Sequence, residues 1–132
     1  MTNQLSDLEE VARAAQAVDG IESAAVFVAR PGSSDLELTG AAGIEGPPLD
    51  GLVEAVRNPA HPIARALHDT APTFDVRPMN PGGPALRSHL PLGGRGVLAV
   101  AHEGSLSAVS RSALEELAAS AAAILLRATE VG

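Results

Sequence analysis

The sequence of 132 residues predicts a single α+β domain, residues 1–132, built on a five-stranded antiparallel sheet with helices on both faces. Two apolar runs, residues 23–29 and 96–101, lack a polar face and are typical of central strands. Each run adjoins turn residues and a second strand-like segment, which indicates two antiparallel hairpins. Amphipathic helical patterns precede, separate and follow these hairpins.

The N-terminal part is predicted to form a helix and then a hairpin. Residues 6–9 read SDLE, the form of a capping box, so a helix is expected to begin at about Ser6. Its apolar residues recur at spacings of three and four, and Gly20 supplies a stop. The apolar run 23–29 and the alternating segment 36–39 then flank a turn, and we expect the first strand near the sheet centre and the second at an edge.

The remaining chain is predicted to contain two short helices, three strands and a long final helix. Both short helices follow prolines, which favour the first helical turn. Gly93 and Gly94 suit the positive φ angles of a tight hairpin turn. The expected elements cover residues 49–56, 62–67, 73–76, 85–92, 95–101 and 110–128, with a loop over 77–84.

The composition excludes several classes of function. The chain has no cysteine, which rules out disulfides, thiolate nucleophiles and Cys-ligated metal centres. Its net charge is -7, and its nine basic residues are arginines scattered without a cluster. Binding to nucleic acid or to an anionic membrane needs a clustered positive surface, so neither is expected. The acidic, polar start does not resemble a signal peptide, and we expect a cytoplasmic protein.

The order of several segments resembles that of a GAF domain. No one of them is specific, but together they span nearly the whole chain. The first apolar strand is followed by RPG at 30–32, LEL at 36–38 and AAGI at 41–44. Later in the chain come RSHLPL at 87–92, a glycine turn at 93–94 and GVLAV at 96–100. The last helix has the pattern LxxLAxxA at 114–121.

This resemblance implies a GAF/PAS-like sheet with the N- and C-terminal helices on one face and the short helices on the other. It also implies a sensory or regulatory module that binds a small molecule or only dimerises. The fold does not choose among ligands. Covalently attached bilins and redox cysteines are excluded without cysteine, and the chain has no lysine for the Asn-Lys signature of cyclic-nucleotide-binding members.

Arg87 and His89 are the leading ligand-binding candidates. Their spacing of two places them on one face of a strand, opposite Leu86, Ser88 and Leu90. One interpretation is a solvated strand face. The other is a site for a small anion, in which Arg87 pairs with a carboxylate or phosphate and His89 adds a donor.

The chain has only two aromatic residues that could line such a site. Phe74 is expected to form an apolar wall, because it precedes the 77–84 loop. Phe27, from the first central strand, is the weaker candidate.

The other histidines and serines give no strong sign of catalysis. His61 precedes Pro62 and is expected to cap a helix, His68 is expected at the end of that helix, and His102 is expected in an exposed loop. Ser88 and His89 point to opposite strand faces and cannot act as a pair. We therefore expect no catalytic residues, no metal site and no cofactor.

The last helix has a second apolar surface opposite its core-facing stripe, consisting of Ala119, Ala122, Ala123 and Leu126. The alanines could reflect composition alone. Otherwise their small side chains allow close approach of a second helix, and the resemblance to GAF domains implies a homodimer through terminal helices.

Two functions of different class follow from these observations. The first is a non-catalytic signalling module that dimerises, binds a small anionic metabolite or no ligand, and acts on a signalling partner. The alternative is a redox-active, metal- or haem-binding sensor or an enzyme on the same fold.

Overall fold

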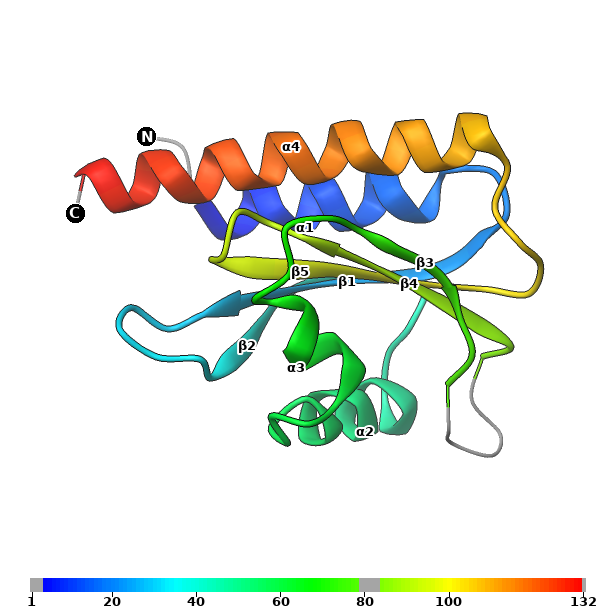
Figure 1. Cartoon of the computed structure of the whole chain (residues 1–132), viewed down its shortest axis with the longest axis horizontal. Helices are drawn as coiled ribbons and strands as arrows, with labels where there is room; N and C mark the ends of the chain where they lie inside the picture. Colours follow the sequence, from blue (N-terminus) through cyan, green and yellow to red (C-terminus); the bar gives the residue numbers. More distant parts are fainter. Residues whose placement is uncertain (1–3, 79–83, 132) are drawn as a thin grey trace.

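The computed structural model describes residues 4–78 and 84–131, which form a three-layer α+β domain (Figure 1). Helices α1 and α4 lie side by side on one face of the sheet, and α2 and α3 cover the other. The elements are α1 Gln4–Gln16, β1 Ile21–Ala29, β2 Leu36–Ala42, α2 Pro47–Ala55, α3 Pro62–Ala66, β3 Thr73–Val76, β4 Leu86–Pro91, β5 Gly96–His102 and α4 Ala108–Val131.

The five strands form one sheet in the order β2-β1-β5-β4-β3, with every neighbouring pair antiparallel. The two apolar strands β1 and β5 pair with each other inside the sheet, and β2 lies at an edge, as predicted. Gly93 and Gly94 connect β4 and β5 with φ angles of 68° and 79°, which is the backbone that a two-residue hairpin turn requires. The predicted α+β fold is thereby confirmed.

Alternating residues of the strands build two separate cores. On β1, Ala24 and Val26 face α1 and α4, whereas Ala25 and Phe27 face α2 and α3. Because β1 and β5 are covered on both sides, they can be apolar at every position. Full burial of Phe27 contributes about 2–3 kcal/mol through the area removed from water.

Two predicted helix starts are wrong. Helix α1 begins at Gln4, so Ser6 lies inside it and does not begin it. Helix α4 begins at Ala108, where the Ser107 hydroxyl accepts a hydrogen bond of 3.1 Å from the Ser110 amide. Ser107 is thus the residue that caps α4. None of the helices in the described part of the chain is both long enough and apolar enough to cross a membrane.

Candidate functional site

A cavity of about 640 Å³ lies between the sheet and α2, on the face opposite α1 and α4. It is lined by strand residues of β1, β4 and β5, by α2, and by the segments beside them. The lining residues are Glu22, Ser23, Ala24, Ala25, Gly43, Ile44, Pro47, Pro48, Gly51, Leu52, Ala55, Pro84, Ala85, Arg87, Ala99, Val100, Ala101 and Glu103.

The cavity exists because the opposing surfaces carry small side chains. The sheet presents Ala25 and Ala99 there, and α2 presents Gly51 and Ala55. A Cβ atom added at Gly51 would meet no other atom within 4 Å. Under α3, by contrast, larger apolar side chains fill the same face of the sheet, and Phe27, Ile63 and Leu67 are completely or almost completely buried.

Gly43 forms part of the cavity wall where the chain leaves β2 toward α2. Its φ angle is +76°, and an added Cβ atom would lie 2.4 Å from the backbone oxygen of Glu22. Only glycine permits both this conformation and this approach. The close contact holds the wall against the start of β1.

Among the described residues that line the cavity, Arg87 is the single one with a positive charge. Its guanidinium makes no hydrogen bond or ion pair with another described residue. Burial lowers the pKa of its guanidinium, because the charged form is poorly solvated there. An anion in the cavity would supply the missing counter-charge.

His89 lies on the same strand face as Arg87, opposite Ala99 of β5. The residue is 3% exposed, and its Nε2 atom has no hydrogen-bond partner among the described residues. Burial, with smaller contributions from Arg87 and His61, lowers its pKa to about 4. The imidazole is therefore neutral at pH 7.

His61 caps α3, as its position before Pro62 predicts. Its Nδ1 atom accepts a hydrogen bond of 3.1 Å from the Ile63 amide. Burial and the nearby Arg87 lower the pKa of His61. Arg87, His61 and His89 thus form a group of three basic side chains on the α3 side of the sheet.

The two phenylalanines do not belong to the cavity lining. Phe27 is fully buried in the core under α2 and α3. Phe74 packs against the core on the α1 and α4 face, where the Arg111 guanidinium lies 4.9 Å from the centre of its ring. Of the four proposed ligand-binding residues, the structure places only Arg87 at the cavity surface.

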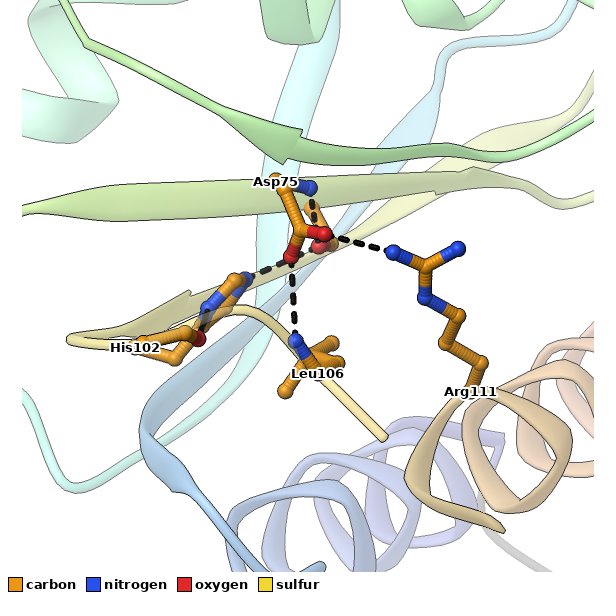
Figure 2. Close-up of polar contacts among 6 residues, drawn as sticks. Asp75, His102, Leu106 and Arg111 are labelled. Carbon is orange, nitrogen blue, oxygen red and sulfur yellow. Dashed lines mark hydrogen bonds and ion pairs between the residues drawn. The ribbon is translucent and has the colours of Figure 1, made fainter. Parts of the chain in front are cut away.

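A polar network on the opposite face of the sheet was missed by the sequence reasoning (Figure 2). The prediction that His102 lies in an exposed loop is wrong. His102 is fully buried at the end of β5. Its Nε2 atom lies 2.9 Å from the Ser88 hydroxyl, and its Nδ1 atom lies 2.8 Å from the Gly104 carbonyl. Nδ1 must carry the proton that it shares with this carbonyl, so Ser88 donates to Nε2.

Asp75 joins this network to α4. Its amide donates to Ser88 over 3.1 Å, and its carboxylate accepts hydrogen bonds from the Leu106 amide at 3.1 Å and from the Arg111 guanidinium at 2.5 Å. Asp75 has a φ angle of 58°, a conformation that Asp tolerates better than most residues. Asp75 therefore holds β3 to β4 through its amide, and to the connection after β5 and α4 through its carboxylate (Figure 2).

The Ser88–His102 pair has the contact of a nucleophile and its base, but both side chains are completely buried. A substrate cannot reach either group. The network is therefore structural. The described residues also contain no group of three or more His, Asp or Glu side chains suited to hold a metal ion.

The proposed dimer residues on α4 do not all face the same way. Ala119 and Ala123 are exposed, and Leu126 is 43% exposed. Ala122 is half-buried, packs against the core below α4, and lies close to the Gly93 turn. We call Ala119, Ala123 and Leu126 the outer face of α4.

Comparison with known proteins identifies the fold. No protein-family model matches the sequence, and no curated protein matches it. Among solved structures, the second GAF domain of DevS from Mycobacterium smegmatis is 22% identical, with 97% of each chain covered and a TM-score of 0.72.

Two further GAF proteins are similar at lower identity. The GAF domain of an Acinetobacter phosphoenolpyruvate-protein phosphotransferase has a TM-score of 0.76 at 13% identity, covering 100% of this chain and 87% of that chain. A GAF domain/HD domain protein from Geobacter sulfurreducens has a TM-score of 0.75 at 14% identity, covering 96% and 94%. The chain therefore has a GAF-like fold, as its sequence indicates.

Proposed function

We propose that this domain is a non-catalytic regulatory module that binds a small anionic molecule in the cavity beneath α2. The observation that carries the proposal is Arg87, a cavity-lining guanidinium with no partner among the described residues. A partly buried charge without a counter-charge is unfavourable, and a bound anion would relieve that cost. The cavity volume of about 640 Å³ is in the range of small-molecule sites.

The fold supports a regulatory role by analogy, since the similar solved structures are GAF domains. The buried Ser88–His102 pair and the lack of a metal-binding group in the described residues give no support to an enzyme or a metal-dependent sensor. We therefore do not propose either.

Filling the cavity tests this function. Gly51→Phe would place a ring in the open space beside α2, and a helix tolerates this residue better than glycine. We expect a ligand from a library of small anions to raise the Tm of the wild type by about 4 °C at about ten times its Kd, but not that of the variant. Glu54→Phe, at an exposed position of the same helix, should respond as the wild type does.

If no member of the library stabilises the wild type, or if Gly51→Phe responds equally, the cavity is not a ligand site.

We also propose that two copies of the domain associate through the outer face of α4. Ala119, Ala123 and Leu126 follow one another at spacings of four and three, which places them on one side of the helix. Small side chains permit another helix to approach closely, and Leu126 supplies an exposed apolar contact. A second copy presents the same surface, as a two-fold dimer requires.

The double variant Ala123→Glu with Leu126→Glu is expected to weaken dimerisation by more than about tenfold, because it buries like charges at the interface. Sedimentation velocity measures the effect. Val109→Glu, a change at a more exposed apolar residue at the other end of α4, should leave the dimer intact. A wild type that is monomeric at high micromolar concentration contradicts the proposal.

A further inference from the structure

We infer that the ligand is a carboxylic acid with a compact apolar body, and not a nucleotide or another polyphosphate. This inference rests on the proposed function and names the chemical class that the cavity accepts. Its basis is the distribution of charged, apolar and aromatic residues around the cavity.

The single positive charge of the described lining is at Arg87, on β4. One planar guanidinium can bind one carboxylate through two parallel hydrogen bonds. A polyphosphate carries several charges and needs several basic groups or a row of backbone amides. The nearest other basic groups are His61 and His89, and burial keeps both neutral at pH 7 by lowering the pKa of each.

Apart from Arg87, Glu22, Ser23 and Glu103, the residues of the lining are apolar or glycine, and the polar half of the lining surface comes from those four residues and the backbone. Alanines of β1 and β5 form the floor, and Leu52 and Ala55 of α2 face them. These side chains offer no hydrogen bonds to a sugar or a base. They favour a saturated or branched hydrocarbon body, which leaves water when it binds.

Two acidic residues, Glu22 and Glu103, complete the lining and are exposed. They oppose the approach of a molecule with several negative charges, whereas a single carboxylate paired with Arg87 is less affected. The lining also has no aromatic residue in the described part of the chain, so a base would find no ring on which to stack. These features together exclude nucleotides more strongly than simple acids.

The same chemistry could come from a free carboxylic acid or from an α-amino acid. The carboxylate and the apolar body are common to both. An amino acid adds an ammonium group, and the acidic side chains in the lining are Glu22 and Glu103. The test therefore includes both sources.

Isothermal titration of the purified domain tests the assignment with 4-methylpentanoate, octanoate, their amides, leucine and ATP. We expect at least one of the acids, or leucine, to bind. The amide of a binding acid should have an affinity lower by about tenfold or more, and ATP should not bind. Arg87→Gln should weaken binding of the acid by about tenfold or more and leave the affinity for the amide unchanged. Arg65→Gln, at an exposed arginine of α3, should bind as the wild type does.

Several results would overturn the inference. Equal affinity for acid and amide, unchanged binding by Arg87→Gln, or preferential binding of ATP each contradicts the assigned class. The inference also fails if no acid or amino acid binds but another member of the library does. If Gly51→Phe blocks the binding of that compound, the proposed function survives. If no compound binds at all, the proposed function fails together with the inference.

Discussion

Replacing Asp75 with alanine is expected to lower the free energy of unfolding by about 3 kcal/mol. The change removes the acceptor of the Leu106 amide and the ion-pair partner of Arg111. It also places alanine at a φ angle of 58°, which is unfavourable for a residue that lacks a short polar side chain. The Arg111 side chain is 40% exposed, so water offsets part of the loss and we expect the lower end of the range for buried pairs.

The variant Asp75→Asn separates the charge from the geometry. Asparagine tolerates the same φ angle and can accept a hydrogen bond from the Leu106 amide, so we expect about half the loss. Asp69→Ala, at an exposed position before β3, serves as the control. Urea unfolding of the three variants measures the differences. A loss below about 0.5 kcal/mol for Asp75→Ala would mean that the network does not hold α4 to the sheet.

The second large effect is a loss of stability in acid caused by His89. Its pKa is about 4 in the folded protein and 6.5 when unperturbed, so the unfolded chain takes up the proton first as pH falls. The contribution of neutral His89 is complete above about pH 6.5 and decreases through pH 4. Between pH 7 and pH 5 the folded state should lose about 2 kcal/mol from this residue alone.

His89→Leu should remove this part of the pH dependence, because leucine has no titratable group. His68→Leu, at an exposed histidine, should retain the acid sensitivity of the wild type. Urea unfolding at pH 7 and pH 5 provides the comparison. Equal losses in wild type and His89→Leu would show that His89 is not held neutral by its surroundings.

Much of the fold could be predicted from local sequence patterns. Residues 24–29 of β1 and 97–101 of β5 are all apolar because both faces of these strands are covered, and the sequence shows this directly. The Gly93-Gly94 pair identifies the β4–β5 turn through the backbone that it permits. The predicted start of α1 was wrong because a capping-box pattern can also occur inside a helix that begins earlier in the chain.

The site was only partly predictable, since its parts come together through tertiary contacts. The alternation of β4 places Arg87 and His89 on one face and Ser88 on the other, as expected. The burial of His102 depends on Ser88, fourteen residues earlier, and on Gly104. The position of Phe74 depends on Arg111 of α4. The residues next to His102 and Phe74 in the sequence give no indication of Ser88 or Arg111 as partners.

The central claim, that a small molecule binds between α2 and the sheet, is tested most directly by following backbone amide NMR signals during titration with the library of small anions, 4-methylpentanoate and leucine included. The account predicts saturable shifts at residues of the cavity lining, including Gly43, Gly51, Ala99 and Ala101. The same titration of Gly51→Phe should produce none. Signals that stay unchanged in the wild type, or shifts confined to α1 and α4, would contradict the claim.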